Sequence, residues 1–272
     1  MEISKLIKRT LSGIVYCAII VALAFSGEWG ILALCVLLAL FSCLELAKLD
    51  KELNPNNIAL IILDIAGCVS LVMTIYGLPI FIWLAVMLAR FIEELYVESD
   101  HHLRNLASSM LAQIYIGVPM ACMAGIGCII SPMAVLAVFF FLWINDTGAF
   151  LIGSSFGKHR LFEKMSPKKS WEGFFGGLLL CVVAACVFCA VCNGFFQMRI
   201  LNAEYMRWIG LAIIVSVFGT WGDLVESMIK RTMHVKDSGR IIPGHGGILD
   251  RIDSLLLAVP ACSLYFALLE CL

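Results

Sequence analysis

The sequence predicts an all-α polytopic integral membrane protein, and three observations lead to this fold class. Hydrophobic residues make up 61% of the 272 positions, whereas soluble domains are usually about 45–50% apolar. Charged residues make up only 14% of the chain, and the formal net charge is −1. The apolar residues also gather in runs of about 17–25 residues, the length that crosses a bilayer as a helix. The bilayer is therefore the expected partner, and a near-neutral chain gives no reason to expect a nucleic acid.

Nine such runs follow one another along the chain, and they predict about nine transmembrane helices. The runs lie near residues 11–26, 29–47, 58–76, 78–96, 106–125, 129–150, 173–194, 206–228 and 250–271. The fourth run contains Arg90, and the fifth is weakened by Gln113. The first run follows a basic segment, as in a signal peptide, but the many runs after it favour a retained first helix. We expect one membrane domain over residues 1–272, with N-terminal helices in 1–130 and catalytic helices in 131–272.

The basic residues between the runs predict the orientation of the chain. Nearly all of them follow an even number of crossings, and only Arg199 and Arg207 fall on the opposite side. Because short basic loops stay in the cytoplasm, the N-terminus and the two longest basic loops, near residues 158–169 and 230–240, are expected there. Short loops and the lack of an appended domain favour a bacterial inner-membrane protein. Candidate chemistry is expected at the cytoplasmic ends of the C-terminal helices.

The eighth run ends in a regular polar pattern. Asp223, Glu226, Ser227 and Lys230 recur at helical spacing and therefore share one face of a helix. A polar stripe on a membrane helix is costly, so we expect it to face the protein interior or a wet cavity. The alternative is a solvated helix end.

Residues 230–253 contain eight charged side chains and two histidines around a turn of Pro and Gly. The glycines, Gly246 and Gly247 among them, permit backbone conformations closed to other residues and allow close approach of a ligand. Amide groups at the start of the following helix can bind anionic oxygens. Carboxylates can hold a hard cation such as Mg²⁺, which bridges phosphate oxygens while Lys and Arg neutralise the remaining charge. This segment therefore predicts a site for a polyanion and a metal.

A second basic loop spans residues 145–177 and begins with Asp146 at the end of the sixth run. Its GSSFGKH stretch is not a P-loop, because the glycines are too close and His159 replaces the required Ser or Thr. In SPKKS, we expect Ser166 to cap a helix that begins at Pro167, so that free amides lie beside Lys168 and Lys169. The alternative is an ordinary basic cytoplasmic loop, which does not explain the nearby Glu172 and glycines.

These residues together resemble the phosphatidate cytidylyltransferase family, also called CDP-diacylglycerol synthases. The resemblance is carried by SMIKR at 227–231, KD at 236–237 and PGHGGILDRID at 243–253, with DTGAF at 146–150 and SPKKSWEG at 166–173. It covers roughly residues 140–255 closely, and the N-terminal helices only in general character. The resemblance implies a membrane enzyme that joins CTP to phosphatidic acid, and it suggests a homodimer.

The resemblance also implies roles for individual residues. Asp223 and Asp250 would be the principal ligands of Mg²⁺, and a second, monovalent cation stays open. Residues expected to neutralise phosphate or act at the reacting centre are Lys230, Arg231, Lys236, Asp237, Arg251 and Asp253, with Glu226 as a supporting carboxylate. Residues expected to contact substrate are Asp146, Ser166, Lys168, Lys169, Glu172, Ser227, His245, Gly246 and Gly247. Arg251 could instead pair with Asp250 or Asp253, and His245 could simply fix the glycine turn.

Two other functions compete with this interpretation. A CTP-dependent lipid kinase would move the γ-phosphate onto an alcohol and release CDP instead of pyrophosphate. A transporter would use its polar residues to line a translocation path, but such residues usually lie near the middle of the bilayer. The polar residues of this chain cluster at the ends of the runs instead.

Overall fold

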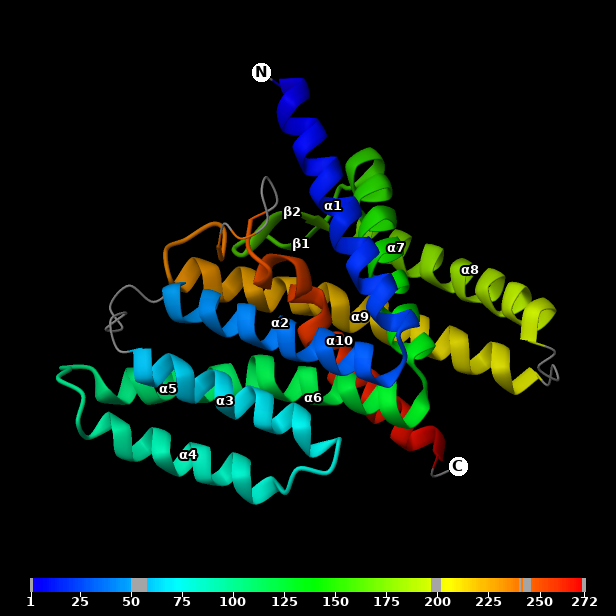
Figure 1. Cartoon of the computed structure of the whole chain (residues 1–272). Coiled ribbons are helices and arrows are strands. Elements are labelled where there is room, and N and C mark those ends of the chain that lie inside the picture. The colour runs from blue at the N-terminus through cyan, green and yellow to red at the C-terminus, as the bar shows by residue number, and fades with distance from the viewer. Residues whose placement is uncertain (1, 50–57, 197–201, 240, 242–245, 271–272) are drawn as a thin grey trace. The chain divides into compact units, whose positions relative to one another are not determined.

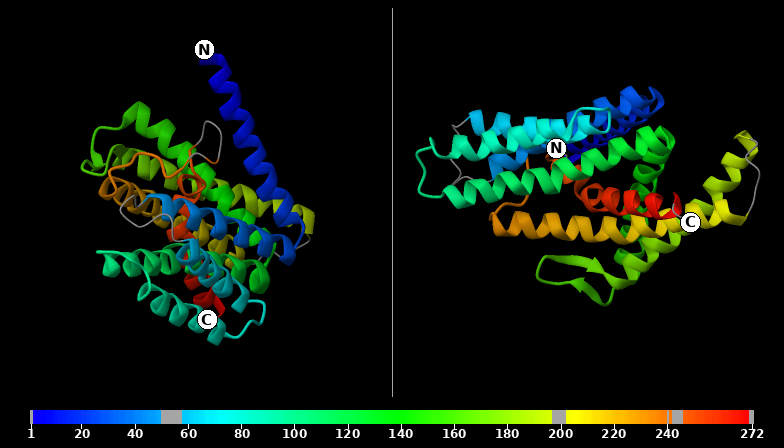
Figure 2. Two further views of the ribbon diagram at one scale, coloured as in Figure 1. Left: turned by 60° about the vertical axis from the view of Figure 1, so that its left-hand side comes forward. Right: turned by 90° about the horizontal axis from the view of Figure 1, so that it is seen from below.

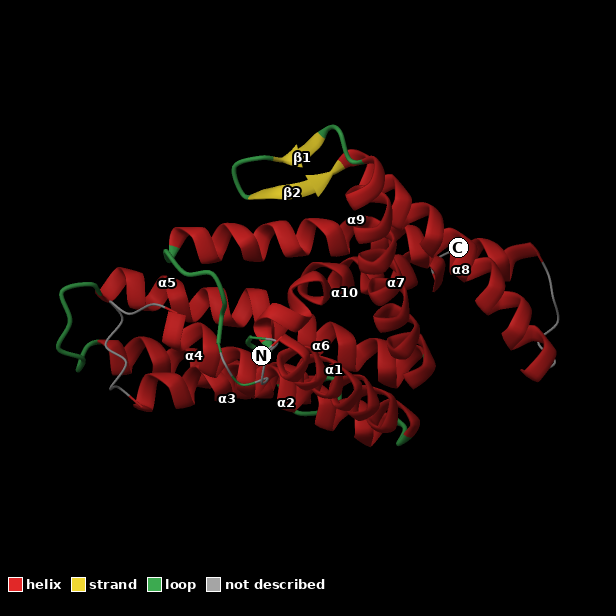
Figure 3. Cartoon of the chain, turned by 90° about the horizontal axis from the view of Figure 1, so that it is seen from above, coloured by secondary structure: helices red, strands yellow, loops and turns green. Residues whose placement is uncertain are grey.

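The computed structural model describes residues 2–49, 58–196, 202–239, 241 and 246–270. The chain divides into two compact units: Met1–Leu136 with Lys230–Ile252, and Ala137–Ile229 with Asp253–Leu272. Figure 3 shows that helices account for nearly all of the regular structure. The predicted helical membrane-protein class is therefore confirmed.

The first unit is a bundle of helices that coincide with the predicted runs. They are α1 (Glu2–Phe25), α2 (Glu28–Leu49), α3 (Ile58–Thr74), α4 (Ile80–Glu94), α5 (His102–Ala112) and α6 (Val118–Gly125), with π-helical turns at Gln113–Gly117 and Ile126–Ile130. Helix α2 packs against α1, α3 and α6, and α3 packs against α4 and α6 (Figures 1 and 2). Leu34 and Cys35 of α2 and Met120 of α6 are buried in its core. The unit also contains the start of α10 (Leu249–Glu270), which supplies part of the candidate site.

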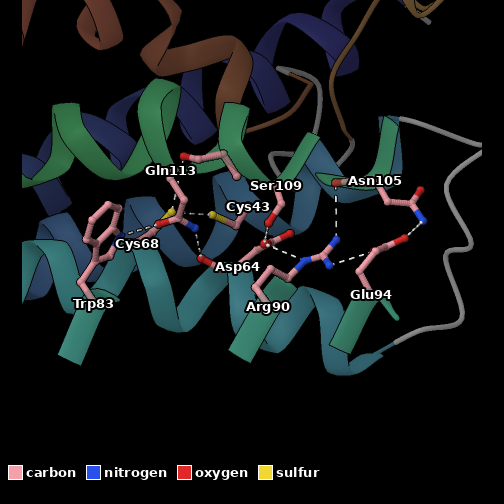
Figure 4. Close-up of polar contacts among 10 residues, drawn as sticks. Cys43, Asp64, Cys68, Trp83, Arg90, Glu94, Asn105, Ser109 and Gln113 are labelled. Carbon is pink, nitrogen blue, oxygen red and sulfur yellow. Dashed lines mark hydrogen bonds and ion pairs between the residues drawn. The ribbon is translucent and has the colours of Figure 1, made fainter. Parts of the chain in front are cut away.

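The two polar residues that interrupt the fourth and fifth runs bind partners inside this unit (Figure 4). Arg90 is 1% exposed. Its guanidinium donates to Glu94 at 2.8 Å and to the carbonyl of Asn105 at 3.4 Å, and it lies 3.6 Å from the Asp64 carboxylate. The Gln113 amide donates to the carbonyl of Asp64 at 3.0 Å. Buried polar groups are tolerated when they are paired in this way, so both runs can form buried helices.

The second unit contains most of the C-terminal helices and one hairpin. Its elements are α7 (Pro132–Phe156, from residue 137), β1 (Arg160–Phe162), β2 (Ser166–Ser170), α8 (Trp171–Phe196), α9 (Asn202–Thr232, to residue 229) and α10 (Leu249–Glu270, from residue 253). The strands are antiparallel, with Arg160 opposite Ser170 and Phe162 opposite Ser166. The hairpin, yellow in Figure 3, connects α7 to α8 along the chain. These strands are not expected from the sequence, where SPKKS favours the start of a helix.

Glycines allow α7 and α8 to pack closely within the second unit. A Cβ atom on Gly148 would lie 2.8 Å from Leu180 and 3.1 Å from the Cα of Gly177. A Cβ atom on Gly173 would lie 2.8 Å from the carbonyl oxygen of Ala149. Close approach through small residues is typical of helices that pack in membranes. This packing places the end of α7 beside the start of α8, where the candidate pocket lies.

Six helical segments are long and apolar enough to cross a bilayer, among the residues that the structure describes. They are Glu28–Leu49, His102–Ile130, Pro132–Phe156, Trp171–Val191, Tyr205–Thr232 and Leu249–Leu269. Thr10–Phe25 and Ile58–Thr74 are shorter apolar helices, and α4 has 15 residues. The nine predicted runs thus all form helices, whereas nine crossings stay a prediction.

Candidate active site

The second unit has a pocket of about 530 Å³ between the hairpin, α7, the start of α8 and α9. Its lining mixes acidic and basic groups, namely Asp146, Arg160, Lys168, Lys169 and Asp223. A concave site with a few convergent charged groups is the usual form of a ligand pocket. Four of these five residues, all but Arg160, belong to the predicted site, so the fold brings them together.

Lys169 is bound at the centre of this charged lining. Its ammonium lies 2.6 Å from a carboxylate oxygen of Asp223 and donates to the carbonyl oxygen of Thr220 at 3.2 Å. The side chains of Lys169 and Asp223 are 24% and 35% exposed, so the pair is accessible from the pocket. Asp223 also accepts a hydrogen bond from Ser227 at 3.3 Å, one turn along α9, as the helical spacing predicts.

The base of the pocket contains a polar contact that the sequence analysis missed. Asn145, 2% exposed, accepts a hydrogen bond from Ser216 at 2.6 Å and donates to Thr220 at 3.4 Å. These bonds tie α7 to α9 directly beside Asp146 and Lys169. The signal for Asn145 was weak, because a single amide next to an acid gives no spacing pattern.

Further carboxylates gather around Asp223 in the same unit. Asp253 lies close enough to Asp223, Glu226 and Asp146 for their charges to interact. Glu226 is fully buried and Asp223 half-buried, so this part of the stripe is not a solvated helix end. Clustered carboxylates repel one another, and a bound cation relieves that repulsion.

The donor set fits Mg²⁺ in one of its usual arrangements. No three Asp, Glu, His or Cys side chains converge on a single ion position within the described part of the chain. However, Mg²⁺ commonly takes only one or two carboxylates and completes its shell with water and substrate phosphates. Asp223 with one neighbouring carboxylate satisfies that requirement. Asp250, the other expected ligand, belongs to the first unit.

Asp250 is held by three donors within the first unit. One carboxylate oxygen accepts a hydrogen bond from the Lys230 ammonium at 2.8 Å. The other accepts from the amides of Ser238 and Gly247, each at 2.9 Å. The neighbouring Gly246 has a φ of 88°, a conformation that suits glycine and that the sequence analysis expected in this turn. Asp250 is thereby fixed at the first turn of α10.

The chain matches the model of the cytidylyltransferase family over residues 7–269. The chain therefore belongs to the cytidylyltransferase family. It is 45% identical over 128 residues to a protein named phosphatidate cytidylyltransferase from Staphylococcus aureus (strain COL), which covers 46% of each chain. A protein of the same name from Bacillus subtilis (strain 168) is 46% identical over 127 residues, which cover 47% of this chain and 44% of that protein. The matched region thus spans about half the length of these curated relatives.

One predicted feature of the site, the helix cap at Ser166, is wrong. Ser166 does not cap a helix: residues 166–170 form strand β2, and α8 begins at Trp171. The cap is Ser170, whose hydroxyl accepts a hydrogen bond from the amide of Gly173 at 3.2 Å. Pairing with β1 extends SPKKS and moves the helix start by four residues. The first amides of α8 therefore follow Lys168 and Lys169 in the chain instead of starting at Pro167.

The Glu172 carboxylate, predicted to contact substrate, binds groups of the protein in this structure. Its carboxylate accepts hydrogen bonds from the amides of Lys158 and His159 at 3.1–3.2 Å, and lies 2.6 Å from the His159 ring. Glu172 therefore fixes the turn that leads into the hairpin.

Most of the remaining predicted residues lie at the protein surface. Arg231, Lys236, Asp237 and Arg251 are exposed, and His245 lies outside the described residues.

Gly247 is close to a buried carboxylate, Glu45, which is not among the residues predicted from the sequence. The available signal was a single acid in the apolar run 29–47, a feature that by itself marks a membrane residue as a candidate for function.

Proposed function

We propose that this chain transfers CMP from CTP to phosphatidic acid and gives CDP-diacylglycerol and pyrophosphate. The observation that carries the proposal is the match to the cytidylyltransferase family over residues 7–269. The names of the similar bacterial proteins supply the lipid acceptor. The charged pocket of the second unit supports it independently, because it offers both signs of charge to a nucleotide phosphate and a cation.

The proposed chemistry is an in-line displacement. A phosphate oxygen of phosphatidate attacks the α-phosphorus of CTP and forms the new P–O bond. The bond from the α-phosphorus to the bridging oxygen of the β-phosphate breaks, and pyrophosphate leaves with that electron pair. The attacking oxygen is already anionic, so the reaction needs no strong general base. Alignment and neutralisation of charge are what the protein has to provide.

The described side chains can perform these tasks. Lys169 exchanges its contact with Asp223 for a phosphate oxygen, and Lys168 adds positive charge to the same pocket. Lys230, Arg231, Lys236 and Arg251 neutralise further phosphate charge. Asp223 and Asp250, with support from Asp253, are the residues that would hold Mg²⁺, and the ion would supply positive charge to the phosphate oxygens. Asp146 and Ser227 orient the groups around the Asp223 carboxylate.

The bilayer position of the reaction follows from the substrates. Phosphatidate keeps its acyl chains in the membrane while CTP arrives from water, so the site belongs at a membrane surface. The basic loops follow an even number of predicted crossings, which supports a cytoplasmic surface, and the bacterial relatives support an inner membrane. We also propose a homodimer, which cross-linking in lipid nanodiscs would test.

The first experiment follows the α-phosphate. Purified protein in detergent–lipid micelles receives phosphatidic acid, Mg²⁺ and CTP labelled at the α-phosphate. We expect label in the lipid and release of pyrophosphate, and loss of both on chelation of Mg²⁺. An unlabelled lipid with accumulation of CDP would instead identify a kinase. No conversion of CTP, with an intact fold shown by circular dichroism, would refute both enzyme assignments and favour a transporter.

A further inference from the structure

Glu45 is a buried carboxylate that lies far along the chain from every residue of the predicted site. It belongs to α2, and only 1% of it is exposed. One oxygen accepts a hydrogen bond from the amide of Ile248 at 2.9 Å. The other accepts from the amide of Leu249 at 2.8 Å and from the hydroxyl of Ser238 at 3.1 Å. A buried charge is tolerated only when it is bound in this way.

These bonds occupy the N-terminus of α10. The first amides of a helix have no partner within the helix and carry partial positive charge, so they bind anions well. From the sequence, the anion expected at these amides is a phosphate. Instead, the Glu45 carboxylate from α2 binds the amides of Ile248 and Leu249. Helix α2 therefore contributes directly to the structure of residues 247–249.

Two glycines make room for this carboxylate. A Cβ atom on Gly239 or on Gly247 would overlap the carboxylate of Glu45. These glycines therefore permit a protein side chain, rather than a ligand, to approach the main chain. Ser238 completes the connection, because its hydroxyl donates to Glu45 and accepts a hydrogen bond from the amide of Asp250 at 3.2 Å.

The same short segment also positions Asp250. The amides of Ser238 and Gly247 bind the Asp250 carboxylate. The hydroxyl of Ser238 also binds Glu45, and Gly247 directly precedes Ile248, whose amide binds Glu45. A shift of the backbone at residues 247–249 would therefore move Asp250 and its contact with Lys230. Misplacement by about 1 Å at a reacting centre can cost about 100-fold in rate.

We propose that Glu45 is a positioning residue for the transfer reaction: it fixes residues 238–239 and 247–249 so that Asp250 and Lys230 keep their reactive arrangement. It makes no contact with substrate in this role. The inference rests on the proposed function for its kinetic consequence, but the structural part, fixation of the segment by Glu45, can be tested without turnover.

Glu45→Gln is the sharpest test, because both oxygens of Glu45 are acceptors. The glutamine has the same shape, but its NH₂ group must face an N–H or hydroxyl donor, and the negative charge at the helix N-terminus is lost. We expect kcat per folded molecule to fall about 10–100-fold, as for residues that orient a metal ligand. The KM values for CTP and phosphatidate should change little. Glu45→Asp keeps the charge and should recover part of the rate.

Hydrogen exchange supplies the readout that does not depend on activity. In Glu45→Gln, the amides of a peptide covering residues 246–255 should exchange faster, while peptides of α3 keep wild-type protection. Glu28→Gln is the matched control, since it makes the same change on the same helix at an exposed position. It should leave both exchange and kcat at wild-type values.

Three outcomes would overturn the proposal. The first is a folded Glu45→Gln variant with wild-type exchange at 246–255 and kcat within twofold. The second is loss of activity only in proportion to loss of folded protein, which identifies a purely structural residue. If Glu45→Gln does not fold, Glu45→Asp decides. The third outcome is then a Glu45→Asp variant whose kcat per folded molecule is within twofold of wild type. A wild-type protein that does not label lipid refutes the proposed function instead, and the exchange experiment still tests fixation by Glu45.

Discussion

The contact between Lys169 and Asp223 leads to a prediction that separates catalysis from stability. Lys169→Met keeps most of the side-chain length and removes the ammonium that contacts Asp223 at 2.6 Å and Thr220 at 3.2 Å. Because the two side chains are 24% and 35% exposed, the ion pair should contribute no more than about 1 kcal/mol to folding. A change of that size shifts Tm by only about 2–4 °C in a chain of this length.

The expected effect on turnover is much larger. If the Lys169 ammonium binds a phosphate whose charge changes in the transition state, its loss should lower kcat about 100–1,000-fold, as for removal of one preorganised donor. The assay is transfer of α-phosphate label from CTP to lipid, with Tm measured on the same preparation. Lys164→Met is the matched control, because Lys164 is exposed in the same hairpin and lies outside the pocket lining. Turnover by Lys169→Met above one third of wild type would refute the role of this lysine.

Two further predictions concern the first unit. Asp250→Asn should remove most turnover while the protein stays folded, because one acceptor oxygen and the charge opposite Lys230 are lost; near-normal activity at saturating Mg²⁺ would rule out a ligand role. Arg90→Met should remove the guanidinium from the buried Glu94 and the half-buried Asp64 and destabilise the unit by about 3–5 kcal/mol. Thermal unfolding in detergent measures that loss, and an unchanged Tm would show that the pairing contributes nothing.

The helices and part of the site could be predicted because both depend on local patterns. Apolar runs give the positions of membrane helices directly, and the spacing of Asp223 and Ser227 gave their shared helix face. The strand at SPKKS could not be predicted, because Ser-Pro is a good local helix start and only pairing with residues 160–162 overrides it. Glu45 was missed for a related reason: its partners lie about 200 residues further along the chain, and no spacing rule connects them.

The choice of cation distinguishes the candidate site from the scaffold. Arg90 donates to two partners and lies beside a third, and it is almost fully buried with Glu94, at 2% and 3% side-chain exposure. A planar guanidinium held by several partners is suited to a fixed structural contact. Lysine instead pairs with the acids of the proposed site, with Lys169 on Asp223 and Lys230 on Asp250.

An ammonium is a compact point charge on a flexible stem, so it can leave one anion for another at lower cost than an arginine held by several partners. This property is what the proposed reaction requires, since each lysine has to leave its carboxylate to bind phosphate, and the freed carboxylate would then be able to hold a metal ion. Replacement of Lys169 by Arg keeps the charge but favours a fixed contact with Asp223. Turnover should therefore fall in Lys169→Arg although the ion pair persists. A fully active Lys169→Arg variant would show that charge alone is sufficient and that exchange of the pair is not part of the reaction.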